Sequence, residues 1–151
     1  MQQSRFFTNM VVAISTALLL SGWGGRLAFA QEKQVVVVHL SHYTDDLHAA
    51  FMALKLATAM QQKGAQTTLM LDLEGVRLAS TQQPQDLRWG TSDAISGYYD
   101  AFVKAGGKIL VCPHCAQAAG VDAKTLRSGA QIVKEEELAT ALLAADKILD
   151  Y

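Results

Sequence analysis

The stretch VVVVHL at residues 35–40 decides the fold class. A continuous run of mostly β-branched residues is typical of a strand that is buried on both faces of a parallel sheet. The sequence after it changes to helical spacing, with Leu47, Phe51 and Leu54 on one face, and this pattern ends at Gly64. These residues therefore predict one strand followed by one helix.

The alternation continues to the end of the chain. Thr44 is the expected N-cap residue of the first helix, with acidic residues behind it in the first turn. Further strands are predicted at 67–73, 108–112, 131–133 and 147–151, and further helices at 93–105 and 135–145. Strands that alternate with helices form parallel sheets with right-handed crossovers. We expect an α/β fold, a three-layer α/β/α sandwich with a mainly parallel five-stranded sheet.

The first thirty residues have the three-part pattern of an export signal. Arg5 is the only charged residue before an apolar run at 10–20, and a small-x-small triplet ends at Ala30. The apolar run is too short to cross a bilayer as a helix. We expect cleavage after Ala30, so that 1–30 is a signal peptide and 31–151 a periplasmic domain with no stable membrane insertion.

Composition indicates one globular domain and excludes several partner classes. The chain has 151 residues, of which 50% are hydrophobic and 18% are charged. Its 13 basic and 14 acidic residues give a net charge of -1, and loss of Arg5 and Arg26 with the signal peptide lowers the basic count from 13 to 11. A mildly acidic domain does not attract phosphate backbones, so we expect no nucleic-acid partner.

Ligands of an open α/β sheet bind at the carboxyl ends of its strands. The first two strands deliver polar side chains to that edge: His39, Ser41, His42, Tyr43, Asp45, Asp72 and Glu74. The second strand also leads into a long segment, 74–92, that holds Arg77 and Arg88. A connection of this length is expected to be a lid or to contain a short helix.

The third strand delivers the two cysteines of the chain, Cys112 and Cys115, with Pro113 and His114 between them. A thiolate beside a histidine is a good nucleophile, and the Cys-x-x-Cys spacing is that of redox and metal sites. Thiol-disulfide exchange and metal binding with nearby histidines both remain open from the residues alone. The motif follows the third strand, whereas thioredoxin-like proteins carry it after the first, so that fold is disfavoured. No His-x-x-x-His pair supports a metal site, and we assign no cofactor.

The first helix carries a second apolar stripe, formed by Met52, Leu56 and Met60. A helix that is apolar on most sides packs against the sheet and also against something else. That second partner is either another subunit or the rest of this small domain.

The segment from Ile109 to Val121 resembles the active-site segment of the DsrE/DsrF-like proteins, also called the YchN-like fold. In that family a strand ends in a cysteine with a glycine eight residues later, and Cys112 and Gly120 have this spacing. The ending at 142–151, with its Ala-Asp-Lys turn before a last strand, is also similar. Together with the opening run, the resemblance covers nearly all of 34–151.

The resemblance implies a small α/β sandwich that assembles into trimers or hexamers and carries sulfur as a cysteine persulfide between partner proteins. Cys112 matches the residue that accepts sulfur, and Cys115 matches a second cysteine of the YchN-like branch. His114 is then a candidate base, and His42, Tyr43, Arg77 and Arg88 are candidate substrate-binding residues, the two arginines by attraction of an anionic sulfur donor.

Three features differ from the family pattern. The loop after the first strand is rich in histidine, with His39 and His42. Ala119 stands where relatives often have arginine, and the sulfur-relay relatives are cytoplasmic. We expect an exported sulfur carrier that works with a sulfur donor or acceptor protein. The alternative is a non-catalytic metal-binding or thiol-disulfide redox partner protein that uses Cys112, Cys115 and nearby histidines.

Overall fold

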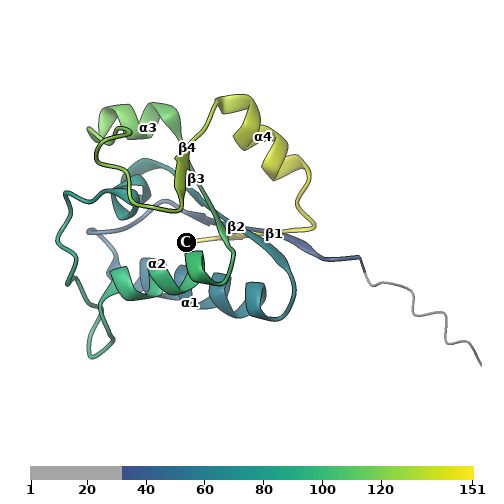
Figure 1. Ribbon diagram of the computed structural model, residues 1–151, viewed down its shortest axis with the longest axis horizontal. Helices are drawn as coiled ribbons and strands as arrows, with labels where there is room; N and C mark the ends of the chain where they lie inside the picture. Colours follow the sequence, from purple (N-terminus) through teal and green to yellow (C-terminus); the bar gives the residue numbers. More distant parts are fainter. Residues whose placement is uncertain (1–31) are drawn as a thin grey trace, which may run out of the picture. The chain divides into compact units, whose positions relative to one another are not determined.

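The computed structural model describes residues 32–151, which belong to one compact unit (Figure 1). The predicted signal peptide and its cleavage site lie outside the described residues. In chain order the elements are β1 (Val35–Leu40), α1 (Leu47–Gln62), β2 (Gln66–Leu71), the 3-10 helix η1 (Leu73–Ala79), α2 (Ile95–Lys104), β3 (Lys108–Val111), α3 (Pro113–Ala118), β4 (Ala130–Ile132), α4 (Glu135–Leu143) and β5 (Lys147–Asp150). None of the helices in this part of the chain has the length and apolar character needed to cross a bilayer.

The five strands form a single sheet in the order β4-β3-β2-β1-β5, and every pair of neighbours is parallel. The predicted α/β fold with a five-stranded sheet is confirmed, and the sheet is parallel throughout. Figure 1 shows α1 and α2 on one side of the sheet and α3 and α4 on the other. Because all strands run the same way, their carboxyl ends meet at one edge.

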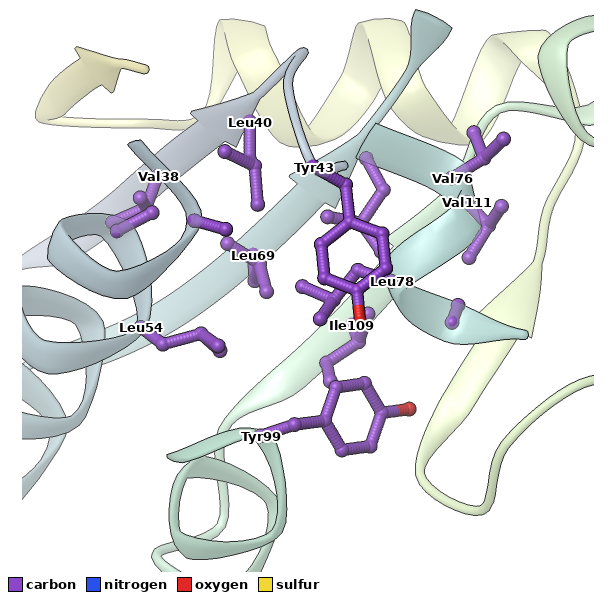
Figure 2. Packing of buried hydrophobic residues seen from close by; sticks show 14 of the residues in the cluster. Val38, Leu40, Tyr43, Leu54, Leu69, Val76, Leu78, Tyr99, Ile109 and Val111 are labelled. Carbon is purple, nitrogen blue, oxygen red and sulfur yellow. The ribbon is translucent and has the colours of Figure 1, made fainter. Parts of the chain in front are cut away.

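The main core lies between the sheet and α1 with α2. Val36, Val38 and Leu40 of β1 belong to this core and are almost fully buried. Figure 2 shows Val38 and Leu40 in it. They pack in one cluster with Leu54 of α1 and Tyr99 of α2. Successive side chains of a strand point to opposite faces of the sheet. One face therefore forms the main core, and the other faces α3 and α4.

The second face is more open. None of the nine residues of α4 is buried within the described part of the chain, and Leu143 at its end is 89% exposed. A cavity of about 710 Å³ lies between α4 and this face of the sheet, lined in part by Val35 and Val37. Ile148 of β5 is 48% exposed. This side of the domain therefore carries apolar surface that the rest of the described chain does not cover.

The predicted N-cap of α1 is wrong by two residues. Asp46 is the N-cap, and its carboxylate accepts hydrogen bonds from the backbone N–H groups of His48 and Ala49, each at 3.0 Å. Thr44 is exposed and lies before the cap. The helix begins at Leu47, and an aspartate directly before the first turn accepts these N–H groups better than a residue two positions away.

The long segment after β2 was expected either to be a lid or to contain a short helix, and it contains a short helix. This helix, η1, is followed by irregular chain up to α2, and the segment is joined to the loop after α3 by a bridge between Ser80 and Leu126. Gly75 of η1 lies directly against the carbonyl of Leu40 at the end of β1. This close approach holds the start of the segment at the carboxyl edge of the sheet.

Candidate functional site

The thiol pair lies where β3 passes into α3. Cys112 is the N-cap residue of α3; its N–H donates to the Leu71 carbonyl at 2.9 Å, and its own carbonyl accepts from Ala116 at 2.9 Å. Cys115 is one helical turn further on. Both cysteines are half-buried and are not joined in a disulfide. The strand end and the first turn of the helix therefore place the two thiols together at the carboxyl edge.

The spacing from Cys112 to Gly120 has a structural reason. Helix α3 ends at Ala118 with Ala119 as its C-cap, and Gly120 follows with a φ of 71°. This left-handed conformation favours glycine and lets the chain reverse, so that Val121 donates to the Ala116 carbonyl at 2.8 Å. The eight-residue interval thus spans one short helix with both of its caps.

A turn after β2 approaches the thiols from the neighbouring strand. Leu73 has a φ of 40°, the single positive value at a non-glycine residue in the described chain, and its backbone N–H lowers the pKa of the Cys115 thiol. The turn is held by backbone hydrogen bonds from Asp72 to Leu40 and from Gly75 to Ser41. The left-handed residue costs about 1 to 2 kcal/mol and aims this N–H at the site.

The environment of Cys115 disfavours its thiolate. Burial raises the pKa of the Cys115 thiol, and the hydrogen bond with Cys112 and the negative charge of Asp72 raise it further, while the Leu73 N–H acts in the opposite direction. Cys115 therefore keeps its proton to higher pH than an exposed cysteine does. Within the pair it is suited to donate a hydrogen bond to Cys112.

Three strands contribute a polar cluster next to the thiols. His39 of β1 lies with Nε2 2.9 Å from Asp72 Oδ2 and with Nδ1 2.8 Å from Asp150 Oδ1. Desolvation lowers the pKa of His39, but the hydrogen bonds and charges of Asp150 and Asp72 together outweigh it and raise the pKa above 6.5. The carboxyl edge therefore holds an imidazole between two carboxylates.

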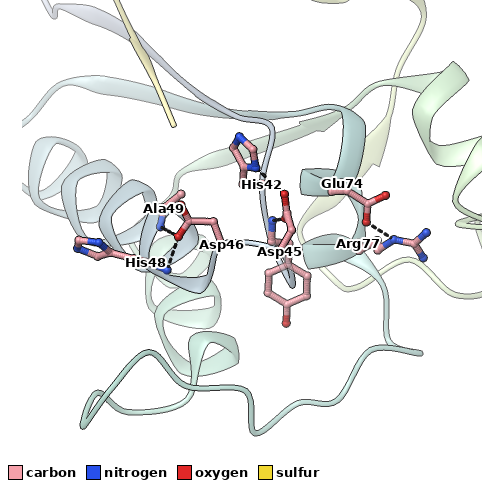
Figure 3. Close-up of polar contacts among 8 residues, drawn as sticks. His42, Asp45, Asp46, His48, Ala49, Glu74 and Arg77 are labelled. Carbon is pink, nitrogen blue, oxygen red and sulfur yellow. Dashed lines mark hydrogen bonds and ion pairs between the residues drawn. The ribbon is translucent and has the colours of Figure 1, made fainter.

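The other predicted site residues bond to neighbours close in sequence. His42 Nδ1 lies 2.6 Å from Asp45, a contact that raises the pKa of His42 and lowers that of Asp45. Arg77 Nε lies 2.6 Å from Glu74, and the two side chains face each other in Figure 3. Arg88 donates to a backbone carbonyl at 3.4 Å. Each of these groups is exposed or partly exposed beside the loop that it stabilises.

Tyr43 and His114 have opposite environments. Tyr43 is 2% exposed and belongs to the hydrophobic core, where burial raises the pKa of its hydroxyl. His114 points outward, and its Nε2 lies 3.6 Å from Glu135 at the start of α4. The structure thus brings together Cys112 and Cys115, and adds residues that the predicted site did not include.

Those additional residues are His39, Asp72 and Asp150. His39 lies near the end of β1 and Asp72 directly follows β2, and both were among the polar residues at the predicted edge. Asp150 was missed because its contact depends on β5 pairing with β1, in a register that sets His39 opposite Asp150. Its position at the end of the last predicted strand was the one signal available.

Metal binding was one of the open alternatives. In residues 32–151 no group of three or more His, Cys, Asp and Glu side chains has an arrangement that would hold a metal ion.

Comparison with known proteins identifies the family of this fold and thiol pair. The family model described as DsrE/DsrF-like matches residues 33–151. The chain belongs to the DsrE/DsrF-like family. This membership implies a protein of the sulfur-relay type. No match was found among curated protein sequences.

Two solved structures share the fold of this DsrE/DsrF-like protein. The YchN protein from E. coli superposes with a TM-score of 0.66 at 22% identity, over 79% of this chain and 99% of that one. MTH1491 from Methanobacterium thermoautotrophicum, a protein of unknown function, gives a TM-score of 0.61 at 13% identity, over 79% of this chain and 100% of that one. Both likenesses support the fold.

Proposed function

We propose that this DsrE/DsrF-like protein carries sulfane sulfur as a persulfide on Cys112. The observation that carries the proposal is the pair of free thiols at the carboxyl edge of the parallel sheet, with Cys115 one helical turn from Cys112. This edge is where ligands of such sheets bind. Cys112 has the family's spacing to Gly120, and Cys115 is biased toward the protonated form.

The chemistry needs two steps. In the loading step the Cys112 thiolate attacks the outer sulfur of a donor persulfide, the donor S–S bond breaks, and the donor leaves as a thiol or thiolate. Cys112 then holds the added sulfur, which an acceptor thiolate can take by attack on that outer sulfur. Alternatively, the Cys115 thiolate attacks the inner sulfur, releases HS⁻, and leaves a disulfide between Cys112 and Cys115.

The proposal includes a location and partners. The signal-like pattern of residues 1–30 supports export to the periplasm, with cleavage after Ala30. The apolar surface on α4 and β5 supports assembly into a homotrimer or homohexamer. The other proposed partner is a protein that donates or accepts sulfur. The proposed base is His114, and the proposed substrate contacts are His42, Tyr43, Arg77 and Arg88.

The test is to incubate the reduced protein with a sulfane-sulfur donor and to measure its intact mass. We expect addition of one sulfur atom that is lost in Cys112→Ser and retained in Cys115→Ser. Circular dichroism of both variants checks that they are folded. Adducts that persist in Cys112→Ser, or tight stoichiometric zinc or copper with no sulfur adduct, would overturn the proposal. A protein that only cycles between dithiol and disulfide with a redox partner would support the thiol-disulfide alternative.

A further inference from the structure

His39 joins the carboxyl ends of three adjacent strands. Its ring lies on β1, between Asp72 after β2 and Asp150 on β5, at 2.9 and 2.8 Å. Both partners are carboxylates, and an imidazole donates from both nitrogens only when it is protonated. The geometry therefore matches the imidazolium form of His39.

Asp72 connects this histidine to the thiols. Its Oδ2 faces His39, while its Oδ1 is buried and has no hydrogen-bond partner among residues 32–151. The residue before it, Leu71, accepts a hydrogen bond from the Cys112 N–H at 2.9 Å, which ties this turn to the thiol segment. The negative charge of Asp72 raises the pKa of the Cys115 thiol. Asp72 thus contacts the histidine on one side and influences the thiol pair on the other.

We infer that His39 is a positioning residue of the thiol pair: its imidazolium offsets the Asp72 charge beside Cys115 and so favours formation of the Cys115 thiolate. Loss of the proton from His39 leaves both carboxylate charges uncompensated, and a thiolate next to uncompensated negative charge is less stable. The titratable groups that face His39 are Asp72 and Asp150, and those that face Cys115 are Cys112 and Asp72.

The consequence for sulfur release rests on the proposed function. The Cys115 thiol gives its proton to water, and the thiolate attacks the Cys112 sulfur of the Cys112–S–SH persulfide. The persulfide S–S bond breaks, HS⁻ leaves, and a disulfide forms between the two cysteines. An external dithiol reductant then restores both thiols. The charged form of His39 favours loss of the Cys115 proton. At a pH low enough to keep His39 protonated, the wild-type protein should therefore release sulfur faster than a variant without this charge.

The experiment measures thiol reactivity and needs no sulfur donor. In a Cys112→Ser background, Cys115 is the single thiol, and its rate of alkylation by iodoacetamide is recorded from about pH 5.5 to about pH 9 with and without His39→Gln. Glutamine preserves a hydrogen-bond donor toward Asp72 but carries no charge. Below the pH at which His39 titrates, we expect the rate to fall roughly threefold to tenfold in the variant. Above it, the two curves should converge.

Two further variants make the outcome decisive. Asp72→Asn should raise the rate at every pH, because it removes the charge that opposes the thiolate. His48→Gln should leave the profile unchanged, since His48 stacks on Trp89 and is not among the groups that act on His39 or Cys115. If His39→Gln unfolds, as judged by circular dichroism, His39→Asn replaces it in the same comparison. Identical curves, or curves offset equally at all pH, would overturn the inference.

Failure of the two proposals can be told apart. A protein that accepts sulfur on Cys112 but shows no effect of His39 retains the proposed function and loses the inference. A protein that shows the His39 effect on alkylation but accepts no sulfur retains the inference about the thiol and loses the proposed function.

Discussion

Gly75 and Leu40 are in such close contact that a side chain on Gly75 would overlap the Leu40 carbonyl group. The contact is made to backbone at the end of β1, and it fixes the turn that carries Asp72 and Leu73 toward the thiols. Absence of a side chain at Gly75 is therefore a condition for the arrangement of the candidate site.

Gly75→Ala should destabilise the protein by about 1 to 3 kcal/mol, because the main chain of β1 cannot rotate away as a flexible side chain would. Urea unfolding followed by circular dichroism measures the change. Gly97→Ala is the matched control. Gly97 lies inside α2, and a Cβ there meets nothing within 4 Å in residues 32–151. That substitution should stabilise the helix by up to about 1 kcal/mol, and equal effects at the two positions would contradict the close-contact argument.

Asp46→Ala should lower the free energy of unfolding by about 0.5 to 2 kcal/mol, because it removes the acceptor of two N–H groups at the start of α1. Thr44→Ala serves as the comparison, since Thr44 is exposed and does not cap the helix. It should change stability by less than about 0.5 kcal/mol. A larger loss from Thr44→Ala than from Asp46→Ala would show that the cap lies at the position first expected from the sequence.

The contribution of His39 to stability should decline as the pH rises above 6.5. The pKa of His39 in the folded protein lies above its ordinary value of 6.5, so the folded state binds the proton more tightly than the unfolded state. The resulting stabilisation is complete below 6.5 and is lost as the pH rises through the folded value. Thermal unfolding of wild type and His39→Gln across this range measures the effect. If the stability of His39→Gln depends on pH in the same way as that of the wild type, the effect does not come from His39.

Light scattering after size exclusion should give three or six times the mass of a single chain. Leu143→Asp should dissociate the assembly, since this side chain on α4 is 89% exposed and an unpaired charge in an apolar interface is costly. Leu56→Asp is the comparison on the α1 stripe, where the side chain is 36% exposed. Dissociation by Leu56→Asp alone would place the interface on α1, and a monomeric wild type would contradict self-association.

Much of the fold was predictable because its signals are local. The β1 prediction at 35–40 matches the observed strand, since an uninterrupted β-branched run is a strong signal. The predicted end of β2 at residue 73 was two residues too late, because Asp72 and Leu73 are diverted into a turn that Gly75 enables by close packing. Such packing between distant segments has no local signature.

The candidate site was predictable only in part for the same reason. Cys112 and Cys115 are marked by their spacing and by the strand before them. The contact between His39 and Asp150 joins residues 111 positions apart, and it follows from the order of strands in the sheet. His42 and Arg77 follow strand ends as well, but nearby carboxylates bind them. A position at the carboxyl edge of the sheet thus indicates which side chains are available to form a site. It does not determine which of those side chains contact one another.

The link from β5 to His39 also bears on how the protein matures. β5 is the last strand in the chain, and Asp150 can reach His39 only after β5 has paired with β1. During synthesis the two cysteines therefore emerge from the ribosome before the charge environment around them is complete. Alkylation kinetics at Cys115 would then report on the docking of the final strand, and a single chemical label could separate finished molecules from folding intermediates.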